Sequence, residues 1–121
     1  MNDNPKILNA QIKNVSVYYE NHGILTFSIA VDISDGTACV IGGYALDEYN
    51  KNTKERQCCV YCLDLLTRIK KVVGVIKWED CKGKYIRVVS NGLDRSITKI
   101  GNLMKDEWLD IPEFIEEYGI K

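Results

Sequence analysis

Apolar residues recur at helical spacing in one long stretch of the chain, residues 57–73. They lie three and four positions apart with charged residues between them, and they are Cys58, Cys62, Leu65, Leu66, Ile69, Val72 and Val73. This pattern predicts one amphipathic helix, capped by Asn52 or Thr53 so that it begins at about 54–55, and ended by Gly74. Because the rest of the chain reads mainly as strands, we expect the apolar stripe to lie across a sheet.

Alternating apolar and polar residues predict three strands before this helix. They cover 7–19, 24–32 and 37–41, and the short turns between them predict an antiparallel meander. In the first strand the apolar residues change parity, which predicts a β-bulge or sharp bend at Lys13 and Asn14.

The glycine pair at 42–43 follows the third strand. Paired glycines end or kink a strand and allow close approach of another backbone or a ligand. The pair lacks the further glycines or the Gly-Lys-Ser/Thr sequence of a phosphate-binding loop. A Rossmann or Walker nucleotide site is therefore not expected.

The second half of the chain predicts smaller elements. Strands are expected over 84–89 and 96–101, with an Asn91-Gly92 turn signal between them, and a single helical turn is expected around 78–80. A capping box at 110–113 predicts a short helix from Ile111 to Tyr118, closed by Gly119.

These elements together predict an α+β fold. It consists of an antiparallel sheet of about five strands with an N-terminal three-stranded meander, packed by the long amphipathic helix, plus a short C-terminal helix. With 121 residues, the chain is expected to form a single domain over 1–121.

Charge and composition exclude several function classes. Sixteen basic and seventeen acidic residues give a net charge of −1, so there is no overall positive field to hold long nucleic acid. No run of eighteen apolar residues and no secretory pattern occur, so we expect no membrane association and a cytoplasmic location. Five cysteines in no regular framework indicate reduced thiols.

Motifs for catalysis or metal binding are weak. Cys59 and Cys62 have the spacing of a zinc or redox pair, but the remaining candidates for further zinc ligands are irregularly separated: Cys39, Cys81 and His22. We interpret the pair as small apolar residues of a buried helical face. The single histidine has no neighbouring nucleophile. The sequence therefore predicts a protein that is not an enzyme and has no metal and no cofactor.

Aromatic and basic residues gather near predicted loop ends. Aromatic faces stack on bases and arginine forks hold phosphate oxygens, so this mixture suits a small nucleotide. The set is Tyr44, Arg56, Trp78, Tyr85, Arg87, Arg95, Lys105 and Trp108. In the alternative interpretation the tryptophans are core or subunit-interface anchors and the arginines are surface charges.

Three blocks of the chain resemble a family of small phage and prophage proteins. They are Gly42-Gly43-Tyr44-Ala45-Leu46-Asp47, the stretch 75–88 containing Trp78-Glu79-Asp80 and Lys82-Gly83-Lys84-Tyr85-Ile86-Arg87-Val88, and the stretch 100–108 containing Ile100-Gly101-Asn102-Leu103 and Trp108. The segment 19–26 also looks like a hairpin of that family, so the resemblance spans most of the chain. The best match is the family of Thoeris anti-defence sponges of the first type. Its members sequester the glycocyclic ADP-ribose signal made by bacterial TIR-domain enzymes, and in some members cyclic oligonucleotides.

The resemblance implies a phage counter-defence protein in the cytoplasm of an infected bacterium. Such a protein binds and sequesters a cyclic ADP-ribose-type immune signal without cleaving it, as a homo-oligomer (a dimer or an assembly of dimers) with pockets at subunit contacts. Depleting a submicromolar signal requires nanomolar affinity, on the order of −12 kcal/mol. For a small ligand this requires near-complete enclosure.

Within this resemblance we expect three kinds of ligand contact. The pyrophosphate would be neutralised by Arg87 together with one of Arg56, Arg95 and Lys105. Adenine would stack on Tyr44 or Trp108, with Trp78 a further candidate. Ribose hydroxyls would hydrogen-bond to Asp47 or Asn102.

Two other function classes stay open. A phage inhibitor that binds a host immune complex directly, like an anti-CRISPR protein, would use Trp78, Trp108 and the acidic segment 110–117 as its interface. A phosphodiesterase that cuts the same signal would require a metal cluster or paired histidines, and the sequence has one histidine.

Overall fold

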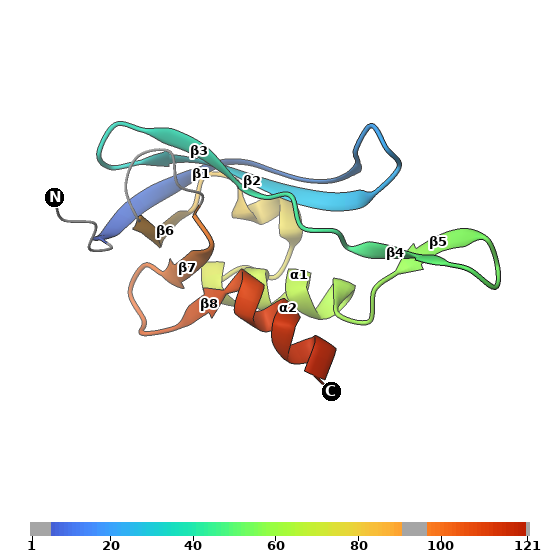
Figure 1. Ribbon diagram of the computed structural model, residues 1–121. Coiled ribbons are helices and arrows are strands. Elements are labelled where there is room, and N and C mark those ends of the chain that lie inside the picture. The colour runs from blue at the N-terminus through green and yellow to red at the C-terminus, as the bar shows by residue number, and fades with distance from the viewer. Residues whose placement is uncertain (1–5, 91–96, 121) are drawn as a thin grey trace, which may run out of the picture.

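Six strands pair into one antiparallel sheet, in the order β3-β2-β1-β6-β7-β8 (Figure 1). The computed structural model describes residues 6–90 and 97–120 of the chain. The strands of this sheet are β1 (Lys6–Tyr19), β2 (Leu25–Ile33), β3 (Ala38–Gly42), β6 (Tyr85–Ser90), β7 (Lys99–Asn102) and β8 (Trp108–Asp110). A separate hairpin consists of β4 (Asp47–Asn50) and β5 (Glu55–Cys58). The helices are α1 (Cys62–Val73), the 3₁₀ turn η1 (Trp78–Cys81) and α2 (Ile111–Ile120). The predicted α+β class is confirmed.

The predicted irregularity in the first strand is present as a register shift. The pairing of β1 with β2 shifts between Ile12 and Asn14, because an extra residue lies on β1 there. After the shift, Val15 lies opposite Ile29 and Val17 opposite Phe27. Ile29 and Phe27 are fully buried, so the shift keeps the apolar residues of both halves of β1 on the core-facing side.

Helix α1 covers the core-facing side of the sheet, as its stripe predicts. Its buried residues are Cys62, Leu65, Ile69, Val72 and Val73. It ends at Gly74, whose φ of 93° lies in the left-handed region and whose N–H donates to Lys70 O at 2.8 Å. The apolar stripe from Cys62 onward and the C-terminal glycine of the predicted helix are therefore confirmed, whereas Cys58, its predicted first member, is exposed and lies in β5.

The predicted start of α1 is wrong. Residues 55–58 form β5 instead, paired with β4 in a hairpin in which Asp47 lies opposite Cys58. The carboxamide oxygen of Asn50 accepts hydrogen bonds from the N–H groups of Asn52 and Thr53, at 2.8 and 3.2 Å. These residues lie in the turn of the hairpin rather than at the start of a helix, because the residues that follow them pair with β4. The helix begins seven or so residues later than predicted, at Cys62.

Gly42 is where the chain leaves the sheet toward this hairpin. Its φ is 134°, and a Cβ on it would lie 2.3 Å from the carbonyl oxygen of Phe27. The next residue, Gly43, donates its N–H to the same oxygen at 3.0 Å. The close approach predicted for this glycine pair is thus an approach of backbone to backbone.

The second half of the chain differs from the prediction in two smaller respects. The predicted single turn is present as η1, and the predicted final strand is present as β7. β8 was not predicted, because three residues are too few to show alternation. The predicted end of the last helix at Gly119 is wrong, since α2 continues to Ile120. The Asn91-Gly92 turn signal lies outside the described residues.

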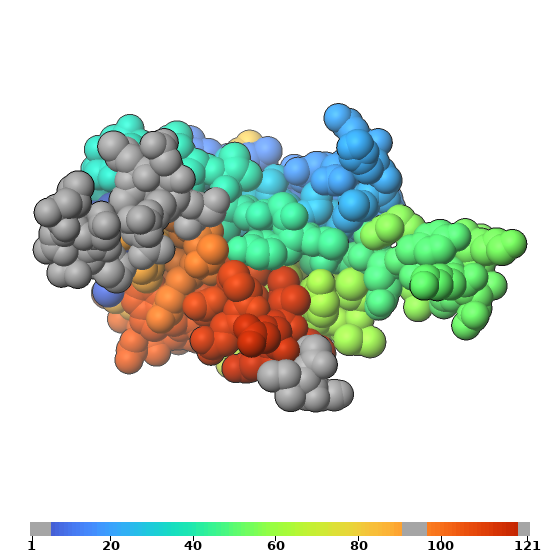
Figure 2. Space-filling view, viewed as in Figure 1, coloured from blue at the N-terminus to red at the C-terminus, as the bar shows by residue number. Residues whose placement is uncertain are grey.

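The two helices lie on the same side of the sheet, and two hairpins extend from the body. In the space-filling view the β4–β5 hairpin (green) and the tip of the β1–β2 hairpin (blue) project beyond the rest (Figure 2). Of the helices in the described part of the chain, none has the length and apolar character needed to cross a bilayer.

Candidate functional site

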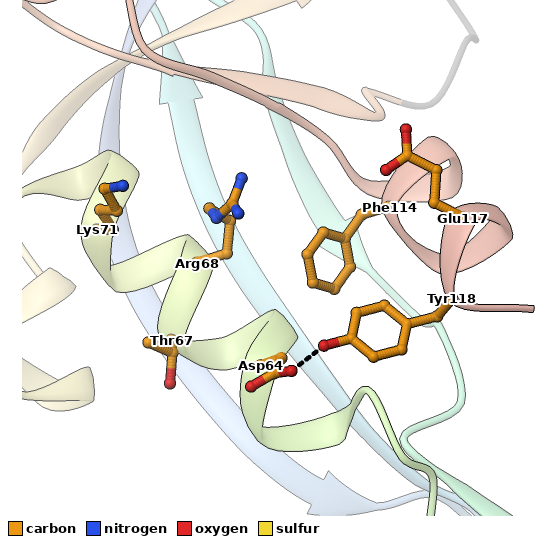
Figure 3. A pocket seen from close by; sticks show the side chains of 7 residues that line it. All are labelled: Asp64, Thr67, Arg68, Lys71, Phe114, Glu117 and Tyr118. Carbon is orange, nitrogen blue, oxygen red and sulfur yellow. Dashed lines mark hydrogen bonds between the residues drawn. The ribbon is translucent and has the colours of Figure 1, made fainter. Parts of the chain in front are cut away.

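A cleft between α1 and α2 has a volume of about 290 Å³ (Figure 3). Its lining residues come from the outward face of α1 and the facing side of α2: Asp64, Thr67, Arg68, Lys71, Phe114, Glu117 and Tyr118. On α1 they follow the spacing i, i+3, i+4, i+7, which places them on one side of the helix. This side is opposite the stripe that α1 buries against the sheet, so its side chains point away from the core.

Arg68 and Phe114 face each other across the cleft (Figure 3). The guanidinium carbon of Arg68 lies 5.7 Å from the centroid of the Phe114 ring, within cation–π range. Among the described residues no carboxylate forms an ion pair with Arg68, so its donors are available to an anion. A free guanidinium beside an aromatic face is a suitable arrangement for a phosphate and a base.

The other charged residues of the cleft have protein partners. Lys71 Nζ lies 3.6 Å from Glu107 Oε2 in the segment before β8, and this lysine is exposed. The hydroxyl of Tyr118 donates to Asp64 Oδ2 (Figure 3). The Tyr118 ring also contacts those of Phe114 and Tyr61, with centroids 5.2 and 6.1 Å away. Tyr118 thus fastens the end of α2 to the start of α1.

Arg87 and Trp108 of the predicted ligand set come together on the opposite side of the sheet. Arg87, Gly101 and Trp108 lie in one row across β6, β7 and β8. The Arg87 guanidinium carbon is 4.6 Å from the Trp108 ring centroid, and Lys99 Nζ is 5.6 Å from it. Both cations therefore already contact the indole ring.

The donors of this arginine are already engaged by backbone. Arg87 Nε donates to Asn102 O and its Nη2 to Lys105 O, both at 2.7 Å. Asn102 Oδ1 accepts the N–H groups of Met104 and Lys105, and its Nδ2 donates to Val72 O near the end of α1. The group thus holds the segment between β7 and β8 in shape and attaches it to α1.

Asp47 and Arg56 form a separate pair at the base of the β4–β5 hairpin. Arg56 Nη2 donates to Asp47 Oδ1 at 2.9 Å, and the Leu25 N–H donates to the same oxygen at 3.1 Å. The Asp47 side chain is 4% exposed, so its oxygens have little access to a ligand. The hydrogen bond from Arg56, opposed by burial, lowers the pKa of Asp47 below its ordinary value.

Tyr44 and Trp78 both pack against Phe27. The Tyr44 ring stacks on Phe27 at a centroid distance of 6.2 Å, and the Trp78 ring meets it edge-on at 6.4 Å. Burial raises the pKa of the Tyr44 hydroxyl. The indole nitrogen of Trp78 is buried without a hydrogen-bond partner in the described part of the chain. Both residues therefore contribute to the core edge, and Arg95, the remaining candidate, lies outside the described residues.

The predicted residues thus fall into separate groups rather than one pocket. β6–β8 and the β4–β5 hairpin lie at opposite ends of the molecule (Figure 1). None of the predicted ligand residues within the described part of the chain lines the α1–α2 cleft. The i, i+3, i+4 spacing of Phe114, Glu117 and Tyr118, matched with that of Asp64, Thr67 and Arg68, was the available signal for it. The spacing shows that each of these sets lies on one face of its helix, but it does not show that the two faces lie side by side in the fold.

The cysteines are free thiols. Cys58 is exposed, whereas Cys62 and Cys81 are buried, and burial raises the pKa of each buried thiol to about 11. Within residues 6–90 and 97–120 no three His, Cys, Asp or Glu side chains are placed to hold a metal ion.

Comparison of the chain with family models, with curated proteins and with solved structures gives no match.

Proposed function

We propose that this protein captures a small phosphate-bearing nucleotide in the α1–α2 cleft and releases it unchanged. More finely, we propose a phage counter-defence protein that sequesters a cyclic ADP-ribose-type immune signal in the cytoplasm of an infected bacterium. The three resembling blocks support the biological role. The placement of Arg68 over Phe114 supports the chemical class of ligand.

Arg68 is the single observation that carries the ligand class. It lies in a cleft and beside an aromatic ring, and it has no carboxylate partner among the residues described. Arg56 and Arg87 differ from it, because their guanidinium groups already donate to Asp47 and to backbone carbonyls. A phosphate would gain charge-assisted hydrogen bonds from Arg68 without displacing a protein acceptor.

The rest of the cleft complements the other parts of such a ligand. Phe114 offers a ring face on which a base can stack. Asp64 and Glu117 provide carboxylate oxygens that accept hydrogen bonds from ribose hydroxyls. Lys71 adds a second cation when its exposed pairing with Glu107 opens.

The cleft volume supports a site that one chain forms only in part. At about 290 Å³ it is at the lower limit of pockets that enclose small organic ligands, which span roughly 300–1,000 Å³. A nanomolar sponge needs most of the ligand surface covered. We therefore propose that a second chain completes the enclosure, in a homo-oligomer.

A capture-and-release experiment tests the function. The protein is incubated with glycocyclic ADP-ribose, separated from free ligand by filtration and heated, and the released compound is identified by mass spectrometry. Intact ligand in the protein fraction is the expected result. A cleaved product would show an enzyme instead. No capture, together with one stoichiometric host protein in a pull-down, would support the rival inhibitor of a host immune complex.

Matched variants test the site. Arg68→Ala is expected to weaken binding about a hundredfold or more, because it removes the cation that holds the phosphate. Lys51→Ala removes the same charge from the exposed turn of the β4–β5 hairpin and should leave affinity unchanged. Isothermal titration calorimetry measures both. If Arg87→Ala abolished binding while Arg68→Ala did not, the site would be on the other side of the sheet.

A further inference from the structure

Strand β1 extends beyond the strand beside it. Its first part pairs with β6 over Lys6–Gln11, and the last bonds on that edge join Ile12 to Gly83 and Lys84. From Asn14 to Tyr19, β1 pairs with β2 alone. In the described part of the chain, no backbone group pairs with the other edge of this segment.

The backbone groups on this open edge can be assigned. The Glu20 N–H donates to Ile24 O within the hairpin, so Glu20 points toward β2. Backbone groups alternate along a strand, and therefore Tyr19, Val17 and Val15 direct their N–H and C=O groups to the open edge. Such a row is a template for another strand.

The segment lacks the features by which proteins block an exposed edge. Asn14-Val15-Ser16-Val17-Tyr18-Tyr19 contains no charged residue and no proline, and valine and tyrosine favour strands. Its side chains are also accessible, with Val17 41% exposed, Tyr18 43% and Tyr19 69%. The hairpin tip beyond it projects from the body of the molecule (Figure 2).

We infer that this edge binds the same edge of a second copy of the chain, forming a continuous antiparallel sheet across a two-fold axis. The register that pairs all three outward-facing residues of each chain places Val17 opposite Val17 of the second copy, with Val15 opposite Tyr19 on each side. These side chains then form apolar cross-strand pairs on the core-facing side of the sheet. The inference concerns assembly alone and is independent of the ligand proposed for the cleft.

Charge at the two ends of the segment favours a second copy over an unrelated strand. Lys13 precedes the uncharged segment and Glu20 follows it, and the Lys13 ammonium is only loosely paired within its own chain, 4.0 Å from Asp32 Oδ2 at an exposed position. In an antiparallel pair each lysine therefore lies diagonally across from the glutamate of the other chain. Lys84, exposed at the start of β6 beside the open edge, adds positive charge near the same glutamate. The edge is thus self-complementary in its backbone hydrogen-bonding groups and in the charges at its two ends.

Sedimentation velocity across a range of protein concentrations tests the inference. The wild type is expected to show a monomer–dimer equilibrium. Val17→Pro removes the central outward N–H and should give a monomer, whereas Val17→Thr keeps this donor and the branched shape and should dimerise. Circular dichroism and thermal unfolding confirm that each variant is folded.

A charge exchange provides a test that keeps every outward backbone donor of the strand. Lys13→Glu also removes the exposed pairing with Asp32, so its stability is compared with that of the wild type by thermal unfolding. Lys13→Glu and Glu20→Lys each place like charges together at both ends of the interface, and each should raise the dimer dissociation constant about tenfold. The double variant restores opposite charges and should return to the wild-type value. A wild type that stays monomeric would overturn the inference. A dimer whose dissociation constant is unchanged by both single charge reversals would also overturn the inference.

Discussion

Trp108 occupies space that Gly101 leaves empty. A Cβ on Gly101 would lie 2.5–2.7 Å from three carbon atoms of the indole ring, closer than carbon atoms can approach. The bare backbone of β7 lets the ring cross it and reach Arg87 on β6, which in turn holds the segment before β8. A glycine with ordinary strand geometry is therefore required here for packing rather than for backbone conformation.

We predict that Gly101→Ala destabilises the fold by about 1–3 kcal/mol, because the added methyl group displaces the indole ring. Urea unfolding followed by circular dichroism measures the loss. In a Trp108→Ala background the same substitution should cost much less, since the clash has gone. Equal losses in both backgrounds would show that the ring is not the obstacle.

Asp47 gives stability a pH dependence whose sign follows from its lowered pKa. The folded state holds Asp47 ionised through Arg56 and the Leu25 N–H, so its pKa is below the ordinary value of 3.8. Its contribution is fully present above the unfolded-state pKa and is lost as pH falls through the folded-state value.

We predict that Asp47→Asn is less stable than wild type at about pH 6, and that the difference shrinks below about pH 3.8. Urea unfolding over this pH range measures the difference. Glu48→Gln, at the adjacent exposed position, should leave stability unchanged at about pH 6, within roughly 0.5 kcal/mol.

At the scale of elements, α2 depends on its first turn. Asp110 Oδ1 accepts the Glu113 N–H at 3.1 Å, the cap that the sequence predicted. We predict that Asp110→Ala costs about 1 kcal/mol of stability, because a first-turn N–H loses its acceptor. Glu116→Ala, at an exposed position of the same helix, is the control and should have a smaller effect. Because α2 carries Phe114, Asp110→Ala should also weaken ligand binding, as measured by calorimetry. A loss of stability with unchanged binding would show that the cleft does not depend on the first turn of α2.

The sequence predicted best those elements in which the regularly spaced apolar residues are also the residues that pack in the core. The apolar stripe of α1 and the change of parity at Asn14 each indicate which side of the element faces the core. The β4–β5 hairpin lacks such a pattern, because all four residues of β5 are exposed and its last residue, Cys58, continues the helical spacing of α1. The ladder with β4 and the turn around Asn50 decide its conformation, and these contacts outweigh local propensity.

The candidate cleft has an arginine beside an aromatic ring, the combination expected from the sequence, but both residues lie outside the predicted set. Arginines beside aromatic rings were expected, and the structure contains two such pairs, Arg87 with Trp108 and Arg68 with Phe114. Composition does not distinguish an arginine whose donors hold backbone carbonyls from one whose donors are open. That distinction depends on the segment before β8, which supplies the acceptor Lys105 O to Arg87.

At the scale of the whole molecule, the rate at which the buried thiols are labelled shows whether the chain unfolds as one unit. Cys62 opens α1 and is 4% exposed, whereas Cys81 ends η1 and is fully buried. Burial raises both pKa values to about 11, which leaves little of the reactive thiolate near neutral pH. Exposed Cys58 lies outside the core and should react without unfolding.

If residues 1–121 form a single cooperative domain, Cys62 and Cys81 become reactive only in the same global opening. We predict that iodoacetamide labels Cys58 first, and that Cys62 and Cys81 then show the same free energy of opening and the same dependence on urea. Mass spectrometry of digested samples, taken across a urea series, measures labelling at each position. A lower opening energy at Cys62 than at Cys81 would mean that α1 leaves the sheet while the remaining core stays folded. The cleft would then be lost before the sheet, and ligand binding would raise the protection of Cys62 alone. Equal protection requires instead that a ligand in the cleft stabilises the entire molecule, by about 2.7 kcal/mol at a hundredfold excess over its dissociation constant.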